Sequence, residues 1–205
     1  PLRSSAASDV YKRQFMNSAV VIIPTYNEAA NIQGLVRAVA DLPIPFDILV
    51  VDDSSPDGTA DLVRELKATF TQLHLEVRKR KQGLGPAYIH GFKWALGRGY
   101  DYLFEMDADF SHPPKSLPPM LALLNEDSAD VVVGSRYKKG IRVRKWPLGR
   151  IILSFGASLY VRIITGLPVA DPTAGFVGYN RKALSALSFD NIRFKGYAFQ
   201  VAIKF

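Results

Sequence analysis

Apolar residues along the chain follow two alternating patterns: short uninterrupted runs and longer stretches with helical spacing. Residues 19–23 form an apolar run that stops at Pro24, and residues 28–40 then place apolar side chains on one helix face, with Asn27 positioned to cap the helix. Uninterrupted apolar runs are typical of buried strands, and helical spacing is typical of amphipathic helices. The same patterns predict further strands at 48–51, 73–77, 102–106 and 130–133, and further helices after Thr59, at 86–96 and at 117–124.

Strands that alternate with helices in this way predict an α/β fold, in which a mostly parallel sheet carries helices on both faces. Ligands bind such sheets at the carboxyl ends of the strands. Polar residues follow four of the predicted strands, so we expect the binding site at that edge of the sheet. These polar clusters are residues 26–28, 52–53, 107–109 and 135–136.

The length of 205 residues is typical of one domain. Residues 1–15 show no periodic pattern and precede the first Met, so we expect a leader that is foreign to the domain. The domain itself is expected over residues 16–205. Residues 199–205 resemble the opening of a helix without a cap or a breaker, and we therefore expect the domain to be truncated at its C-terminus.

Charge is distributed unevenly along the chain, which carries a formal net charge of +7 and no cysteine. The lack of cysteine excludes disulfides and thiolate metal sites, and it fits a reducing compartment. Residues 131–170 contain eight Lys or Arg and no Asp or Glu, which favours an anionic partner such as a nucleotide or a phospholipid. No recognised nucleic-acid reader motif is present, and we do not expect a nucleic-acid partner.

The most apolar segment, residues 151–169, has the wrong pattern for a membrane-spanning helix because Arg162, Gly166 and Pro168 interrupt it. A basic stretch that contains Trp146 leads into this segment. Such a stretch followed by an amphipathic helix suits the interface of an anionic membrane, although a solvated basic face has the same composition.

Two carboxylates, Asp107 and Asp109, follow the predicted strand at 102–106. In an extended chain these two positions point to the same face, so both side chains could bind one cation. Oxygen ligands of this kind suit Mg²⁺ or Mn²⁺ that also binds the phosphates of a substrate. A solvated acidic turn is the alternative that the pattern leaves open.

Polar residues after the first two strands could bind a nucleotide. Tyr26 could contact the base and Glu28 could accept hydrogen bonds from ring N–H groups, or Glu28 could simply lie near a helix N-terminus. Asp53 is the candidate for a ribose hydroxyl or the base. Asp57 and Thr59 are instead expected to form turn and capping hydrogen bonds.

Glycines and basic residues occur further along the chain in patterns that suit phosphate binding. Gly83-Leu84-Gly85 is a near miss for the dinucleotide fingerprint, because Tyr88 replaces its third small residue. Its glycines could still let a ligand approach the backbone beside the basic residues 78–81, although a solvated basic loop is equally compatible. Arg136 and Arg150 could bind phosphate oxygens.

Six motifs occur in order, and together they resemble glycosyltransferase family 2, in particular the polyprenol-phosphate (dolichol-phosphate) mannosyltransferases. The resemblance runs from about residue 19 to the end of the chain. It implies a GT-A fold and an inverting transfer of mannose from GDP-mannose to a polyprenyl phosphate, with Mg²⁺ or Mn²⁺, at the cytoplasmic face of a membrane. The motifs are Pro24-Thr25-Tyr26-Asn27-Glu28, Val51-Asp52-Asp53-Ser54-Ser55-Pro56-Asp57-Gly58-Thr59, Gly83-Leu84-Gly85, Met106-Asp107-Ala108-Asp109, Gly134-Ser135-Arg136-Tyr137 and Asp171-Pro172-Thr173-Ala174-Gly175-Phe176.

The resemblance also implies roles for individual residues. Many members carry a Gln two residues after the second Asp as a further metal ligand, and Ser111 stands at that position here. The residues with implied catalytic roles are Asp107, Asp109, Arg136 and Arg150. The nucleoside is assigned to Pro24, Tyr26, Glu28, Val51 and Asp53, the donor and metal to Asp107, Ala108 and Asp109, and the phosphates to Arg136, Arg150 and Lys195.

Two alternatives remain open from the sequence. The same fold could use another donor, such as UDP-glucose, because base recognition depends on the shape of the pocket. The chain could also be a non-catalytic basic module that binds an anionic membrane or nucleic acid. No general base is expected in the transferase, since a phosphate acceptor is already largely ionised and needs positioning more than deprotonation.

Overall fold

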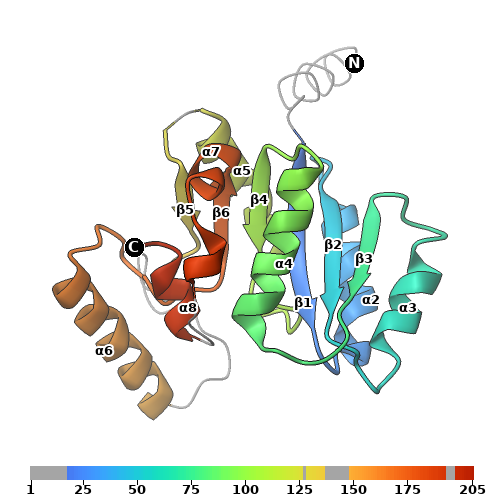
Figure 1. Ribbon diagram of the computed structural model, residues 1–205, viewed down its shortest axis with the longest axis horizontal. Coiled ribbons are helices and arrows are strands. Elements are labelled where there is room, and N and C mark those ends of the chain that lie inside the picture. Colours follow the sequence, from blue (N-terminus) through green and yellow to red (C-terminus); the bar gives the residue numbers. More distant parts are fainter. Residues whose placement is uncertain (1–17, 127, 137–147, 193–196) are drawn as a thin grey trace, which may run out of the picture.

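The computed structural model describes residues 18–126, 128–136, 148–192 and 197–205, which form one six-stranded sheet with helices on both faces (Figure 1). The expected leader at residues 1–15 lies outside the described residues. The strands are β1 (Ala19–Thr25), β2 (Asp47–Asp52), β3 (Leu73–Val77), β4 (Tyr102–Glu105), β5 (Val131–Val133) and β6 (Val177–Asn180). The helices are α2 (Ala29–Ala40), α3 (Thr59–Leu66), α4 (Leu84–Gly97), α5 (Leu117–Asn125), α6 (Leu148–Thr165), α7 (Arg181–Ser185) and α8 (Tyr197–Ala202), with 3₁₀ turns η1 (Pro114–Ser116) and η2 (Phe189–Asn191).

The sheet is parallel over most of its width and antiparallel at one edge. Its order is β3-β2-β1-β4-β6-β5, in which the first four strands run parallel and β6 pairs antiparallel with both β4 and β5. The prediction of a mostly parallel sheet with helices on both faces is therefore confirmed. The pattern missed β6 because its four residues include Gly178 and form no long apolar run.

β1 lies in the middle of the sheet and is buried on both faces, which explains its continuous apolar sequence. Val21 and Ile23 pack into a cluster with α2, α3 and α5, whereas Val20 and Ile22 pack into a second cluster with α4, α7 and α8. None of these four side chains is exposed to solvent. The two clusters are the cores of the two helix layers that Figure 1 shows in front of and behind the sheet.

Helix α6 lies to one side of the sheet (Figure 1). One of its contacts with the rest of the domain is made by Ser158, a buried residue whose Oγ donates a hydrogen bond of 3.1 Å to Oδ1 of Asp171. Large apolar side chains of α6 are nevertheless exposed, among them Leu153 at 75% and Ile163 at 72%. Within the described part of the chain, no helix combines the length and the apolar character that crossing a membrane requires.

The contact between α4 and β1 requires a glycine. A Cβ at Gly91 would lie 2.5 Å from Cγ2 of Ile22, which is closer than packed carbon atoms approach. Gly97 lies in the same helix, and a Cβ there would have no neighbour within 4 Å. The absence of a side chain at Gly91 thus lets α4 pack closely on the central strand.

We expect Gly91→Ala to lower the free energy of unfolding by about 1–3 kcal/mol, because the added methyl group overpacks the core. Gly97→Ala is the matched control, and it should leave stability unchanged or raise it by up to about 1 kcal/mol through helix propensity. Urea denaturation followed by circular dichroism measures both changes. Equal stability of the two variants would contradict the close packing of α4 on β1.

Candidate active site

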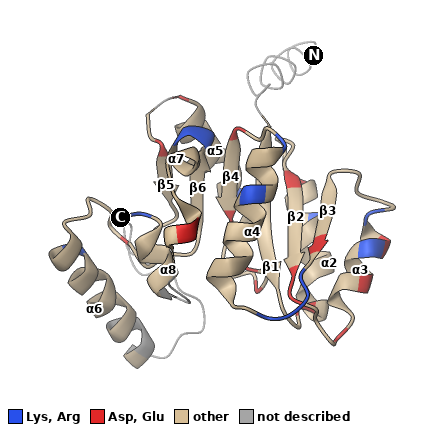
Figure 2. Ribbon diagram, in the orientation of Figure 1, with Lys and Arg blue, Asp and Glu red and all other residues tan. Residues whose placement is uncertain are grey.

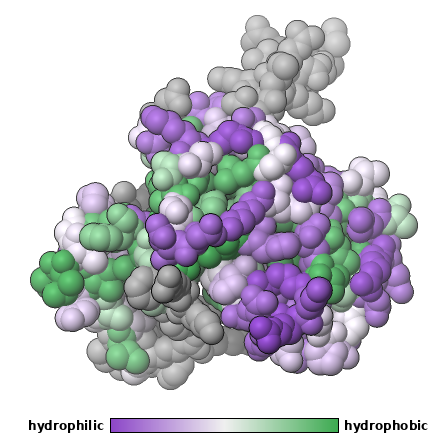
Figure 3. Space-filling view, viewed as in Figure 1, coloured by the Kyte–Doolittle hydropathy of each residue, from purple (hydrophilic) through white to green (hydrophobic). Residues whose placement is uncertain are grey.

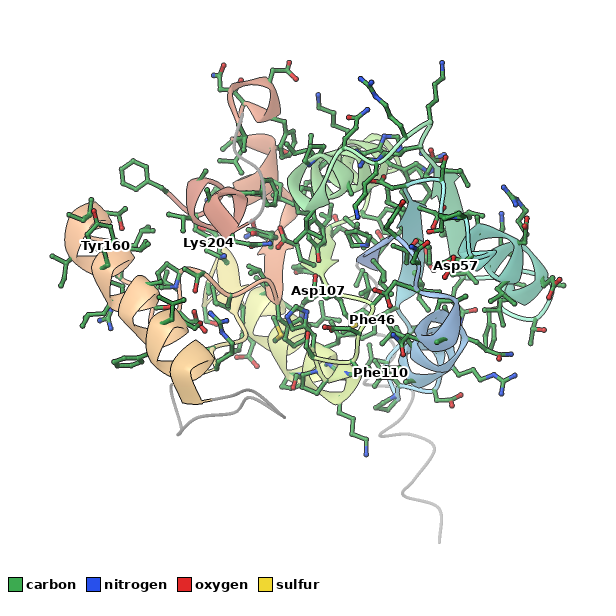
Figure 4. The ribbon with its side chains drawn as sticks, turned by 90° about the horizontal axis from the view of Figure 1, so that it is seen from below. Phe46, Asp57, Asp107, Phe110, Tyr160 and Lys204 are labelled. Atoms are coloured by element: carbon green, nitrogen blue, oxygen red, sulfur yellow. The ribbon has the colours of Figure 1, made fainter. Side chains whose placement is uncertain are left out.

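A pocket of about 300 Å³ opens where β1, β2 and β4 end. Figure 4 looks at this edge of the sheet and shows Asp107 near the middle of the view. The pocket brings together residues from four of the motifs, which are far apart in the sequence. Its walls are formed by Pro24, Thr25, Tyr26, Glu28, Asp53, Lys81, Gly83, Leu84, Ala87, Asp107, Ala108 and Asp109.

Asp107 and Asp109 both line the pocket, but not for the reason that the sequence suggested. Strand β4 ends at Glu105, and the chain turns at Ala108 and Asp109, with Phe110 at φ +59°. The expectation that an extended chain aligns the two carboxylates is therefore wrong. A turn at Ala108 and Asp109 places them instead.

Hydrogen bonds orient the two carboxylates differently. The Tyr88 hydroxyl donates to Oδ1 of Asp107 at 3.0 Å, and the Asp107 backbone N–H donates to Nδ1 of His112 at 3.0 Å. Oδ1 of Asp109 accepts from the backbone N–H of Ser111 at 2.9 Å. The Asp107 carboxylate is therefore held from helix α4, whereas the Asp109 carboxylate is held by a neighbour in the sequence.

The two carboxyl groups also differ in acidity. Burial raises the pKa of Asp107, and the negative charge of Asp109 adds to this effect, although His112 and Tyr88 oppose it. Burial would also raise the pKa of Asp109, but its hydrogen bonds with Ser111 outweigh this and hold that pKa below its ordinary value. A cation between the two groups would relieve the cost of ionised Asp107.

Asp53, the predicted nucleoside ligand, is paired with a residue that the sequence did not single out. Arg78 donates from Nε to Oδ1 at 2.5 Å and from Nη2 to Oδ2 at 2.7 Å, and both side chains are buried. The backbone N–H of Gln82 adds a third hydrogen bond to Oδ2, at 3.2 Å. The pair joins the end of β2 to the loop before α4, so Asp53 reaches the pocket with its charge already offset.

The start of α2 is capped from a different loop. The N-cap residue is Glu28, and Asn27 stands outside the helix at φ +64°, so the predicted Asn27 cap is wrong. Oδ2 of Asp57 accepts from the backbone N–H of Ala29 at 3.0 Å, and Oγ1 of Thr59 accepts from that of Glu28 at 3.0 Å. The expected turn and capping roles of Asp57 and Thr59 are confirmed.

Arg136, the predicted phosphate ligand, lies at the end of β5 and forms a bidentate pair with Asp171. Its Nε donates to Oδ2 at 2.8 Å and its Nη2 to Oδ1 at 2.7 Å, and Nη2 also reaches Oγ1 of Thr173 at 2.7 Å. Burial would raise the pKa of Asp171, but Arg136 outweighs this and lowers it. The pair links two of the six motifs, and the role of Arg136 at the phosphates stays a prediction.

Two other predicted residues that the structure describes, Val51 and Ser111, do not line the pocket. Val51 is fully buried in β2. Ser111 is exposed beside the turn that carries Asp107 and Asp109, which we call the acidic turn. Arg150 lies in the first turn of α6, but its side chain and the whole of Lys195 lie outside the described residues. The ligand roles expected for these four residues stay predictions.

Comparison with known proteins identifies the family. The family model described as "Glycosyl transferase family 2" matches residues 20–188. The chain belongs to glycosyltransferase family 2. Undecaprenyl-phosphate mannosyltransferase from Micrococcus luteus is 45% identical to this glycosyltransferase chain over 186 residues, which are 91% of the chain and 76% of that protein.

Solved structures share the fold of this family 2 domain. Glucosyl-3-phosphoglycerate synthase from Mycobacterium tuberculosis, in complex with Mn²⁺, UDP and glucosyl-3-phosphoglycerate, superposes with a TM-score of 0.66 at 18% identity, covering 99% of this chain and 68% of that one. A mannosyltransferase from Pyrobaculum calidifontis, in complex with GDP-Man and Mn²⁺, gives a TM-score of 0.55 at 20% identity, covering 88% and 54%. The fold is that of the GT-A glycosyltransferases.

The acidic turn of the glycosyltransferase domain fits a divalent cation. Asp107 and Asp109 offer hard oxygen ligands on the wall of one pocket, and among the described residues no cluster of three or more His, Asp or Glu side chains is arranged to bind a metal. Two carboxylates with the remaining positions left to water and phosphate oxygens are the usual protein contribution to Mg²⁺ sites. The residues present therefore suit Mg²⁺ or Mn²⁺ bound together with a phosphorylated substrate.

A buried polar network behind the acidic turn was missed by the sequence analysis. Nε2 of Gln200 donates to Glu105 at 2.7 Å, and the ammonium of Lys204 donates to the backbone oxygens of Pro172 at 3.1 Å and Ala174 at 2.8 Å. Burial raises the pKa of Glu105 to about 7 and lowers that of Lys204 to about 8. The signal available in the sequence was Glu105 itself, an acidic residue inside an apolar run.

The Arg78–Asp53 pair yields a stability prediction. Arg78→Met should lower the free energy of unfolding by about 3 kcal/mol, because it leaves the buried Asp53 carboxylate without its counterion. Arg64→Met is the matched control: it breaks the exposed ion pair with Asp61 in α3 and should cost no more than about 0.5 kcal/mol. Chemical denaturation measures both variants.

The double variant Arg78→Met with Asp53→Asn separates the pair from other effects of the substitution. We expect it to recover part of the lost stability, because no unpaired charge remains in the buried site. A loss for Arg78→Met no larger than that for Arg64→Met would show that the buried pair does not stabilise the domain.

Proposed function

We propose that this glycosyltransferase domain transfers mannose from GDP-mannose to a polyprenyl phosphate, with inversion at the anomeric carbon. The observation that carries the proposal is the position of Tyr26, Asp107 and Asp109 on the walls of one pocket, in a chain 45% identical to an undecaprenyl-phosphate mannosyltransferase. A pocket that offers an aromatic ring and paired carboxylates has the chemistry that a sugar nucleotide with its metal ion requires.

We assign the nucleoside and the diphosphate of the donor to different parts of the pocket. Tyr26, which is 37% exposed, offers a ring face to the base, while Glu28 and the end of β2 offer acceptors to base or ribose N–H and O–H groups. Asp107 and Asp109 would hold the cation that binds the diphosphate. GDP-mannose is preferred over UDP-glucose because the more similar relative is a mannosyltransferase and the P. calidifontis mannosyltransferase was solved with GDP-Man.

The proposed reaction is a direct displacement. An oxygen of the acceptor phosphate forms a bond to the anomeric carbon of mannose from the face opposite GDP, and the bond from that carbon to the GDP oxygen breaks with its electron pair. The acceptor oxygen is already ionised, so no proton has to be removed and the protein contributes positioning. A bound divalent cation would supply positive charge beside the departing diphosphate.

We also propose that α6 places the acceptor lipid by contacting an anionic membrane. Its Leu153, Tyr160, Ile163 and Ile164 are exposed large side chains. Figure 3 shows hydrophobic patches where α6 lies. Figure 2 shows the helix mostly without charge, and the basic residues 138–145 precede it in the sequence. In Figure 4, Tyr160 lies at the outer edge of the molecule, away from Asp107.

An amphipathic helix next to a basic segment is the combination that binds the interface of anionic lipids. The complete lack of cysteine fits the reducing cytoplasmic side of such a membrane. On this side of the membrane, the phosphate of a polyprenyl lipid would be accessible to the domain that carries the pocket.

The transferase proposal predicts metal-dependent donor binding. Asp107→Asn and Asp109→Asn should each weaken Mn²⁺-dependent binding of GDP-mannose by at least about a hundredfold, because a charged oxygen ligand is lost. Asp61→Asn, which removes an exposed carboxylate of α3, should leave the affinity unchanged. Isothermal titration calorimetry with and without Mn²⁺ measures these affinities.

Two further results decide the function. The wild-type chain should bind GDP-mannose more tightly than UDP-glucose, and radiolabelled mannose should be transferred to undecaprenyl phosphate in detergent. The opposite donor preference would replace mannose by glucose in the proposal. Metal-independent binding that survives both aspartate substitutions would instead favour a non-catalytic binding module.

The membrane proposal predicts that α6 controls binding to lipid. Substituting Leu153→Ser together with Ile163→Ser should weaken binding to vesicles of phosphatidylcholine and phosphatidylglycerol by at least about tenfold, through the lost burial of apolar surface. Leu123→Ser is the matched control, because Leu123 is an exposed leucine of α5, 47% accessible. Vesicle co-sedimentation measures binding, and equal loss in the control would contradict a role for α6.

A further inference from the structure

Lys81 lies at the wall of the pocket and contacts the ring that we assign to the base. Its ammonium is 3.7 Å from the centroid of the Tyr26 ring, and both residues line the pocket. Lys81 itself is exposed, in the loop between β3 and α4. The ammonium therefore covers a ring face against which a nucleotide base would stack.

The charges on the pocket walls are unbalanced. Four of the lining residues are acidic, and one of them, Asp53, is already paired with Arg78. Glu28, Asp107 and Asp109 remain, whereas Lys81 is the one basic residue among the described residues that line the pocket. A nucleoside diphosphate adds further negative charge. A divalent cation would be shared between the acidic turn and the phosphates, so a second positive group beside the diphosphate would strengthen binding.

Two arginines at this edge of the sheet, Arg78 and Arg136, are engaged in ion pairs with aspartates. The guanidinium of Arg78 is bound by Asp53 in a bidentate pair, and that of Arg136 is bound by Asp171. Within the described residues, Lys81 forms no such salt bridge; its contact is with the Tyr26 ring. A cation–π contact at an exposed site is weaker than a charge-assisted hydrogen bond to phosphate, so Lys81 can exchange the first for the second.

We infer that Lys81 binds the diphosphate of the donor nucleotide, leaving the face of Tyr26 as the base stacks there. The four-carbon stem of lysine is flexible, so the ammonium can move while the backbone of Lys81 stays in place. The inference rests on the proposed function, in which the pocket holds a nucleoside diphosphate. It adds a phosphate-binding residue from the basic segment 78–81, which neither the motifs nor the comparisons assign.

Calorimetry with GDP in the presence of Mn²⁺ tests the inference. Lys81→Met should weaken GDP binding by about tenfold, the effect typical of one lost charge-assisted hydrogen bond. The affinity of Lys81→Met for guanosine, measured by NMR titration, should stay within about twofold of wild type, because the nucleoside has no phosphate and the base contact is retained. Lys81→Arg keeps the charge and should retain most of the affinity for GDP.

Lys79→Met is the matched control. Lys79 is an exposed lysine two positions away that does not line the pocket, so the substitution removes the same charge from the same loop. Its affinity for GDP should stay within about twofold of wild type, since a distant exposed charge is screened by salt. Raising the ionic strength should weaken GDP binding less in Lys81→Met than in wild type or Lys79→Met, because the variant has lost an ionic contact.

The outcomes separate this inference from the proposed function. If wild type binds GDP and Lys81→Met binds it equally well, the phosphate role of Lys81 is wrong and the transferase proposal stands. If Lys81→Met loses affinity for guanosine and GDP alike, Lys81 contacts the base and the inference is overturned. If wild type fails to bind GDP with Mn²⁺, the proposed function fails and the inference falls with it.

Discussion

Carboxylates crowded at the carboxyl edge of the sheet are the constraint on which the rest of this structure depends. Asp52, Asp53, Glu105 and Asp171 are all buried near this edge. A buried carboxylate is costly unless hydrogen bonds and opposite charges compensate it, so each of them requires partners from other parts of the chain. Thr25 and Ser55 donate hydrogen bonds to Asp52. Arg78 binds Asp53, Gln200 binds Glu105 and Arg136 binds Asp171. These pairings hold the loops in place.

The consequence for function is a division between structural and binding carboxylates. Asp53 and Asp171 are neutralised by arginines, which makes them part of the frame that shapes the pocket. Asp107 and Asp109 face the pocket with neutral hydrogen-bond donors, and burial raises the pKa of Asp107, with a smaller contribution from the charge of Asp109. Two carboxylates whose charge is not offset by an arginine or lysine within the described residues are the ones suited to a cation and, through it, to a diphosphate.

The second half of the domain is organised by the same constraint. Lys204, at the end of α8, holds the loop at 172–174 through two backbone oxygens, and that loop carries Thr173, which binds Arg136. Asp171, at the start of the loop, also accepts from Ser158 of α6. The helix with the exposed apolar surface is thereby connected, through one loop, to the arginine at the end of β5. This arrangement joins the proposed membrane contact to Arg136, a predicted phosphate ligand, by a short series of hydrogen bonds.

The sequence alone determined the strands other than β6, most helices and the positions of the polar clusters, because strand and helix periods are local and polar residues follow most of the apolar runs. It therefore located Tyr26, Asp107 and Asp109 at one edge of a parallel sheet. The tertiary structure decided which charged side chains at this edge are engaged in ion pairs and which can bind a ligand. Arg78 and Asp53 are 25 residues apart and Arg136 and Asp171 are 35 apart, so their pairing depends on how the sheet brings distant loops together. Local periodicity contains no record of such contacts, and for the same reason it could not predict the lysine that covers Tyr26.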